Sequence, residues 1–333
     1  MDRAKRSRWT SRMHGVGSVF VAMALLGTAP AAAQIVDIPA ILDADLKAPP
    51  MSAVVQYGHQ FEADVEDAGT KIARDTAFFG LNQRFKLGER TTLFMVETYT
   101  LHAYDFSGRS GPANRYRWDD VHRIVVAGMI GHDLNDRWRL LGGAMIRSWG
   151  EGGAEFGDTL SGGLLAGFDY HPDPDFSIGL VVGALSKLGG GVGLIPVPTM
   201  RWNMTSDWHV NVGMIQLVDP GVGAMVSHDF TPELSLGAGF AFQSRQYRLA
   251  DKTRVTPTGV RPNRTDDGGI GQERELPIVA LLRYRPTPRI ELDLHGGVAV
   301  GGNIRVEDED GGRIRDDDYD AAGLLGVKAQ FLF

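Results

Sequence analysis

The sequence predicts an all-β protein, a transmembrane antiparallel up-and-down β-barrel. Two observations predict this class. Beyond the N-terminal region, segments of 9–14 residues that alternate apolar and polar side chains recur between turn residues, which is the per-strand signature of a membrane barrel. In the part of the chain that follows the N-terminal region, no apolar stretch approaches the roughly 18–20 residues that a membrane helix requires. No segment there shows a convincing helical periodicity with caps.

The N-terminal region predicts export. A basic start is followed by the uncharged apolar run Val16–Leu26 and by Ala31–Ala33, in the A-x-A form of a cleavage site. A single membrane anchor is the alternative, but Pro30 and the small residues around it favour cleavage after Ala33. The expected organisation is a signal peptide at residues 1–33, a periplasmic lead-in at 34–52 and the barrel at 53–333.

Composition excludes several classes of function. There is no cysteine in 333 residues, so disulfides, thiolate metal sites and cysteine nucleophiles are absent. Loss of residues 1–33 removes five positive charges and one negative charge, which moves the formal net charge from −7 to −11 and argues against a nucleic-acid partner. We expect neither a metal nor a cofactor.

Short polar turns set the number of strands. Periplasmic turns of membrane barrels are short and lie between aromatic girdle residues. Six tight polar turns, most with a large apolar residue on one or both sides, lie at 88–90, 135–137, 171–175, 205–207, 231–233 and 287–289. With both chain ends in the periplasm they give seven hairpins and fourteen strands; twelve strands is the alternative, if one N-terminal hairpin does not pair.

Alternation supports the individual strands. The first is the weakest, with Val55 and Tyr57 expected to face outward. The even-numbered residues of Phe176–Ala184, Trp208–Met214 and Leu234–Phe242 make clearer outward faces. The expected strands are 53–63, 73–86, 91–104, 119–133, 138–149, 158–170, 176–187, 192–203, 208–218, 221–230, 234–248, 274–285, 290–304 and 320–333.

The last predicted strand, 320–333, has apolar side chains at alternate positions up to its final residue. Counting back from Phe333, every second residue to Leu325 is apolar, whereas Lys328 and Gln330 lie on the other face. Termini of soluble proteins usually fray in solvent, so such an ending is unusual for them. The pattern resembles the closing strand of bacterial outer-membrane barrels, which typically ends in Phe and is read by the assembly machinery. This resemblance implies that Phe333 and Phe331 form the membrane-assembly signal.

Charged residues gather near the periplasmic end of the last hairpins. A turn at 287–289 places Arg285 opposite Glu291 and Arg283 opposite Asp293, on one face of the sheet. Two interpretations stay open: a charged constriction that selects solutes, or an ion-pair lattice that keeps the wall rigid, which is favoured because lumenal charges are ordinary in barrels. The lumen-facing candidates are Arg283, Arg285, Glu291, Asp293, His295, Lys328, Arg137 and Arg139. The last two could form a basic stripe inside the barrel with Arg147, Arg201, Arg245 and Arg84.

The expected outer loops offer weaker candidates. Segment 306–320 is acidic but lacks the EF-hand register, so a solvated charge run is favoured over calcium or a divalent bridge to lipopolysaccharide. His102 with Asp105 is the one outer-end pair where a barrel hydrolase would place its active groups, and no motif fixes a nucleophile beside it. We therefore do not expect an enzyme.

The C-terminal 140 residues, approximately from Pro196, resemble a known family. The order of motifs is Pro-Thr-Met-Arg-Trp, a turn, a very short outer hairpin, Leu-Ser-Leu-Gly-Ala-Gly-Phe, Gln-Tyr-Arg-Leu (246–249) and Glu-Leu-Pro-Ile (275–278). It is similar to an uncharacterised family of Gram-negative outer-membrane barrels, a domain of unknown function. The resemblance implies fold and compartment but supplies no site residues. A looser similarity to outer-membrane transporters of aromatic-degradation operons also exists.

The expected function follows from this class. Eight-stranded barrels are filled by side chains and 16–18-stranded ones hold water channels, so fourteen strands predict a narrow or partly plugged lumen. We expect an outer-membrane pore or transporter for small polar or amphipathic solutes. The alternative is a non-transporting surface barrel whose outer loops bind a partner or lipid. Expected partners are outer-membrane lipid and lipopolysaccharide, the barrel assembly machinery and a small solute.

Overall fold

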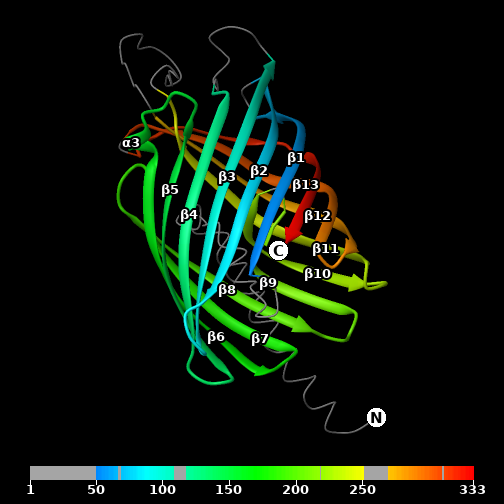
Figure 1. Ribbon diagram of the computed structural model, residues 1–333. Coiled ribbons are helices and arrows are strands. Elements are labelled where there is room, and N and C mark those ends of the chain that lie inside the picture. The colour runs from blue at the N-terminus through cyan, green and yellow to red at the C-terminus, as the bar shows by residue number, and fades with distance from the viewer. Residues whose placement is uncertain (1–49, 67–68, 109–117, 218, 251–268, 310) are drawn as a thin grey trace.

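The computed structural model describes residues 50–66, 69–108, 118–217, 219–250, 269–309 and 311–333. The predicted signal peptide and nearly all of the predicted lead-in lie outside these residues, as does most of the charged loop 250–272. The described residues form one sheet that closes on itself into a barrel, with the chain passing up and down its wall (Figure 1).

The strands follow the predicted order closely. Their bounds are β1 Met51–Val65, β2 Thr70–Lys86, β3 Thr91–Gly108, β4 Asp120–Asp133, β5 Trp138–Glu151, β6 Leu160–Asp173, β7 Phe176–Ser186, β8 Val192–Asn203, β9 Trp208–Gln216, β10 Pro220–Asp229, β11 Leu234–Arg248, β12 Ile270–Thr287, β13 Ile290–Glu307, β14 Arg313–Tyr319 and β15 Ala322–Leu332. A single helical turn, α3 (Phe156–Thr159), lies between β5 and β6. Because β14 and β15 both pair with β13 and with β1, they are two parts of one strand, and the prediction of fourteen strands is confirmed.

The first and last strands close the barrel. β1 and β15 pair antiparallel from Ser52 opposite Leu332 to Gln60 opposite Leu324. The backbone N–H of Phe333 donates to the carbonyl oxygen of Met51 at 2.9 Å, so the terminal residue itself is tied to the seam. Closure removes the exposed strand edges that an open sheet would present for aggregation.

The six predicted periplasmic turns all connect strands, and three share one device. The side-chain oxygens of Asn135, Thr205 and Thr231 each accept hydrogen bonds from two backbone N–H groups two and three residues further on, at 2.9–3.2 Å. Side chains of this type replace a backbone acceptor in a tight turn. The local signal in the sequence was therefore sufficient to place these turns.

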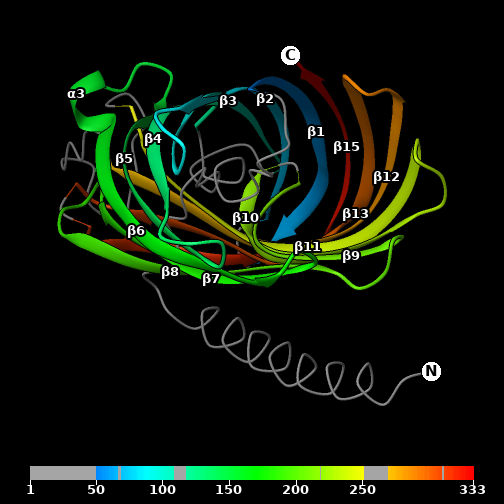
Figure 2. The same ribbon diagram turned by 60° about the horizontal axis from the view of Figure 1, so that its bottom comes forward.

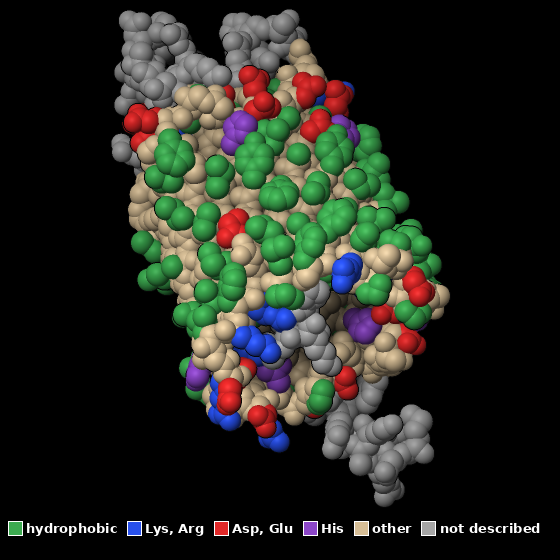
Figure 3. Space-filling model, in the orientation of Figure 1, with side chains coloured by type: hydrophobic (Ala, Val, Ile, Leu, Met, Phe, Trp, Pro, Cys, Tyr) green, Lys and Arg blue, Asp and Glu red, His purple; other side chains and the backbone are tan. Residues whose placement is uncertain are grey.

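The outer surface is an apolar band. Large hydrophobic side chains at alternate positions of the strands are between 36% and 67% exposed, among them Val55, Phe79, Ile146 and Leu194. On the face formed by β1 to β4, Figure 3 shows hydrophobic side chains across the middle, while most of the charged side chains lie toward the two ends. A band of this kind suits contact with lipid. Among the described residues, no helix has the length and apolar character needed to cross a membrane.

One predicted outward face is wrong in part. The even-numbered residues from Trp208 begin outward, and Trp208 is 43% exposed. Met214, however, belongs to an interior apolar cluster with Val222 and Val197. The change follows Gly213, whose φ of +141° lies in a region that favours glycine. At this residue β9 turns away from the wall.

Candidate functional site

The β9–β10 hairpin departs from the barrel wall. β8 pairs with β9 only from Asn203 opposite His209 to Met200 opposite Val212, immediately before Gly213. On the other side, β10 pairs with β11 no further than Val222. The hairpin keeps its own pairing up to Pro220 opposite Gln216, so its tip continues as a two-stranded projection. In Figure 2 this part of β10 lies inside the ring of strands.

The tip of the hairpin reaches strands on the other side of the lumen. The side-chain amide of Gln56 on β1 donates a hydrogen bond to the carbonyl oxygen of Leu217. The Asp219 carboxylate forms ion pairs with Arg123 of β4 at 3.3 Å and with Arg245 of β11 at 2.6 Å. In the order of the sheet, four strands separate β9 from β4, and four separate β10 from β1. The hairpin therefore crosses the lumen, and we call residues 213–217 and 219–221 the lumenal tip.

Asp219 belongs to a buried ionic layer of three arginines and three carboxylates. Its other members are Arg74 on β2 and Glu273 and Glu275 on β12, and all six side chains are at most 4% exposed. Glu275 lies 2.7 Å from Arg74 and 2.8 Å from Arg245. The formal charges cancel. Buried charges are tolerated when they are paired and hydrogen-bonded in this way.

Tyrosines complete the hydrogen bonding of this layer. The hydroxyl groups of Tyr104 and Tyr319 donate to Glu273 at 2.7 and 2.9 Å, and Tyr319 also donates to Glu275 at 3.0 Å. The same rings extend into an apolar cluster toward the outer end of the barrel, which includes Trp118, Trp149 and Tyr247. At this level the inward side chains are buried and packed against one another.

A second apolar cluster lies inside the barrel against β3 to β8. Its members are buried and come from the inward faces of these strands and from the hairpin: Phe94, Val96, Val125, Ala127, Met129, Met145, Leu165, Val181, Leu185, Ile195, Val197, Met214 and Val222. The interior therefore has an apolar region against β3 to β8 and a polar region at the ionic layer.

The predicted pair His102 and Asp105 does not form. His102 faces inward and is fully buried, whereas Asp105 is exposed on the opposite face of β3. His102 Nδ1 lies 3.2 Å from Thr76 Oγ1, and its Nε2 lies 3.7 Å from Asp219. The histidine is thus a neighbour of the ionic layer.

The predicted lumen-facing residues of the last hairpins come together as an ion-pair lattice near the end of the barrel that carries the predicted periplasmic turns. Arg283 pairs with Asp293 at 2.9 Å and with Glu291 at 3.1 Å, and Lys328 pairs with Asp293 at 2.6 Å. Arg285 lies 3.3 Å from Glu291, although a bulge between Tyr284 and Thr287 interrupts the backbone pairing beside it.

The remaining predicted lumen-facing residues, His295, Arg137 and Arg139, do not belong to this ion-pair lattice. His295 continues the inward face of β13 and is 2% exposed. Arg139 pairs with Asp133 at 2.6 Å in the β4–β5 hairpin, and Arg137 lies exposed in the turn of that hairpin. Of the arginines in the proposed stripe, Arg245 is paired with carboxylates and Arg147 donates to Ser161. The stripe is therefore not a row of unpaired cations.

Sequence reasoning missed the ionic layer. Glu273 and Glu275 have the same parity along β12 as Arg283, so alternation marks them as inward-facing once the strand is extended to Ile270. Their partner Arg74 is 199 residues away from Glu273. No pattern in the sequence links two strands at that separation.

A neutralised Asp293 tests whether the periplasmic lattice is structural. We expect Asp293→Asn to lower the free energy of unfolding by about 1–3 kcal/mol, because Lys328 and Arg283 lose a buried charged acceptor. The cation-to-anion selectivity should change little. Urea titration of refolded protein and reversal potentials in a salt gradient measure the two effects. A large selectivity change at unaltered stability would favour the constriction.

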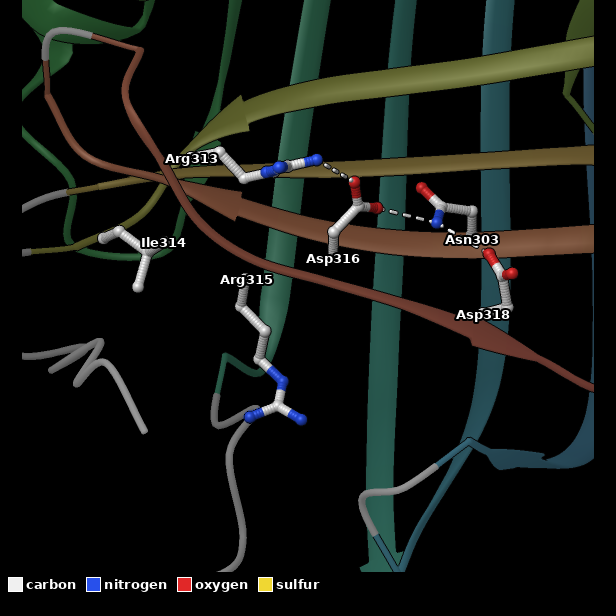
Figure 4. A pocket seen from close by; sticks show the side chains of 6 residues that line it. All are labelled: Asn303, Arg313, Ile314, Arg315, Asp316 and Asp318. Atoms are coloured by element: carbon white, nitrogen blue, oxygen red, sulfur yellow. Dashed lines mark hydrogen bonds and ion pairs between the residues drawn. The ribbon is translucent and has the colours of Figure 1, made fainter. Parts of the chain in front are cut away.

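The outer end of the last hairpin holds a polar pocket of about 510 Å³ (Figure 4). Asn303, Arg313 and Asp316 line it, together with Ile314, Arg315 and Asp318. Burial acts to raise the pKa of the Asp316 carboxyl, but hydrogen bonds from Asn303 and Arg305 outweigh it, so this pKa lies below its usual range. The pocket thus presents paired charges of both signs. Within the described residues, no group of three or more His, Asp or Glu side chains is arranged to hold a metal ion.

Several solved structures are similar to this chain at low sequence identity. No family model matches the chain, and no curated protein matches it. Among solved structures, an outer membrane channel from Pseudomonas putida F1 is similar at 13% identity, with a TM-score of 0.47, over 90% of this chain and 100% of that one. A Pseudomonas aeruginosa FadL homologue is similar at 13% identity and a TM-score of 0.46, over 86% and 91% of the two chains. The Ralstonia pickettii toluene transporter TbuX has 11% identity and a TM-score of 0.39, over 86% and 90%. At these values, function has to be argued from the residues of this chain.

Proposed function

We propose that this protein is an outer-membrane channel for small amphipathic solutes and that the β9–β10 hairpin is its gate. The observation that carries the proposal is the course of the hairpin, which leaves the wall at Gly213 and contacts β1 and β4 across the lumen. Its compartment is proposed from the apolar outer band and the N-terminal export pattern.

The lining supports an amphipathic solute. On one side of the lumenal tip lies the interior apolar cluster, with Met129, Leu185 and Val197 among its members. The tip also contacts the ionic layer, in which Arg123 and Arg245 hold it in place. A solute that follows this route meets apolar and polar surfaces together, and channel selectivity depends on such lining groups.

The wall beside the hairpin is also incomplete. Among the described residues, Val192–Thr199 of β8 has no strand partner on the side toward β9. Ile195 and Val197 from this stretch face the interior apolar cluster. Movement of the hairpin therefore does not have to break a continuous β-ladder along this length, which favours the hairpin as the moving part.

Conductance in planar bilayers tests the channel. Refolded protein is expected to give small, infrequent openings, because in the closed form the lumenal tip crosses the lumen and is held by the ionic layer. Absence of openings at every voltage, both for this protein and for a variant without the lumenal tip, would overturn the proposal.

A non-transporting surface barrel is the second candidate. The outer pocket at Asn303, Arg313 and Asp316 favours it, because its paired charges suit a polar partner such as a lipid headgroup. Exchange of Arg313 and Arg315 for Gln should then abolish binding to lipopolysaccharide vesicles, and the unmodified protein should give no conductance. We propose no enzymatic activity, since His102 is fully buried and separated from Asp105.

A further inference from the structure

We propose that the Asp219 carboxylate is a built-in competitor for the solute, and that the channel passes small amphipathic carboxylates which replace it on Arg123 and Arg245. This inference rests on the proposed channel function and names its substrate class. It starts from the two arginines, which approach the lumenal tip from β4 and β11.

The geometry at Asp219 is that of a bound carboxylate ligand. Oδ1 lies 3.3 Å from Arg123, and Oδ2 accepts from Nε of Arg245 at 2.8 Å. The Asp219 and Arg245 side chains are at most 2% exposed. Guanidinium groups bind any carboxylate through such charge-assisted hydrogen bonds. A solute carboxylate in this position would make the same contacts as Asp219.

Charge balance links departure of the hairpin to entry of an anion. With Asp219 in place, three arginines face three carboxylates. If the tip withdraws, Asp219 leaves with it and one positive charge remains uncompensated in a buried site. Such a charge is costly unless it is paired. A solute anion removes this cost and so favours the open form, whereas a neutral solute of the same shape does not.

The surroundings of the carboxylate site define the rest of the solute. The Arg123 guanidinium lies 4.7 Å from the centre of the Trp149 ring. On the hairpin itself, Ile215 and Leu217 are buried against Ala241 and Val279. When the tip leaves, these two apolar side chains leave with it. The space that they vacate fits a small apolar body attached to the carboxylate.

A polar group without a partner lies on the same side of the lumen. Gln60 on β1 is 2% exposed, and neither its side-chain oxygen nor its nitrogen has a hydrogen-bond partner among the described residues. It stands opposite Arg74 of the ionic layer in the β1–β2 register. Four residues away, Gln56 uses its amide nitrogen for Leu217, while its oxygen has no partner among the described residues. Buried amides of this kind usually have partners, and a solute would supply one.

Benzoate and its neutral counterpart benzamide test the inference on the refolded full-length barrel. Calorimetric titration is expected to show that Asp219→Asn binds benzoate about tenfold more tightly than the unmodified protein, a gain of about 1.4 kcal/mol. Benzamide binding should be equal in both. Adding Arg245→Gln should cancel the gain, because it restores neutrality. Asp229→Asn, at the other end of β10 and paired with His209 outside the layer, is the matched control.

The outcomes separate the two proposals. The carboxylate substrate class is overturned if Asp219→Asn and the unmodified protein bind benzoate with equal affinity. It is also overturned if Asp219→Asn gains as much affinity for benzamide as for benzoate. In either case the channel proposal is retained if Asp219→Asn conducts. If no variant conducts, the channel proposal fails as well. Heat-dependent electrophoretic mobility reports whether each variant has folded. If Asp219→Asn does not fold, the open probability of the unmodified channel tests the carboxylate class instead. Benzoate is expected to raise this open probability, and benzamide is expected to leave it unchanged.

Discussion

Removal of the lumenal tip is expected to raise the single-channel conductance by about tenfold or more, because the side chains that cross the lumen are taken away. The change replaces residues 215–221 by Asn-Gly. Met214 and Val222 face each other in the β9–β10 register, so a two-residue turn rejoins the strands without strain. Planar-bilayer recording of the refolded variant measures the effect.

A matched control exists in the neighbouring hairpin. Ser186 and Val192 also face each other, and replacement of residues 187–191 by Asn-Gly shortens the β7–β8 outer turn in the same manner. This variant should conduct like the unmodified protein. If both variants gain conductance equally, loop shortening and not the lumenal tip explains the increase. If neither gains, the hairpin is not the barrier.

Loss of one charge from the ionic layer is expected to have the largest effect on stability. The Glu273 carboxylate is fully buried and accepts hydrogen bonds from Arg74, Tyr104 and Tyr319. Glu273→Gln removes its charge and keeps its volume. Removal of one partner from a buried network leaves uncompensated charge and should lower the free energy of unfolding by about 3–5 kcal/mol. Urea unfolding in lipid vesicles gives the value.

An exposed ion pair supplies the comparison. Glu62 lies 3.2 Å from Lys71, and about half of each side chain is exposed. Glu62→Gln should cost at most about 1 kcal/mol, because solvent screens the pair. Equal losses from Glu62→Gln and Glu273→Gln would show that the ionic layer is hydrated and not the closed network that we describe.

Most of the fold was predictable because its signals are local. The Thr205 and Thr231 turns are made by side-chain hydrogen bonds within three residues, so a short stretch of sequence is enough to place them. Inward and outward faces follow from alternation, which placed Arg283 with Asp293 through a single turn. These predictions needed only neighbours along the chain or across one hairpin.

The candidate site was not predictable in this way. Alternation predicted that Met214 faces outward. The positive φ of Gly213 instead turns the strand inward. The φ of an isolated glycine in a strand cannot be predicted from the sequence. The sequence shows that the β9–β10 connection is short. The residues that the connection contacts, Gln56 and Arg123, are separated from it by 161 and 96 positions along the chain. Such contacts depend on where the closed barrel brings distant strands.

By itself, the sequence determined the barrel class, the six short turns and the pairing of charges in the last hairpin, since each depends on alternation or on turn chemistry within a hairpin. The alternation along β15 belongs with these. The sequence favoured fourteen strands over twelve, and the pairing of β1 with β15 confirmed that number. Only the tertiary structure decided what occupies the lumen. Curvature and closure of the sheet bring β1, β4, β11 and β12 to a common axis, where the Asp219 carboxylate meets arginines that no local pattern connects to it.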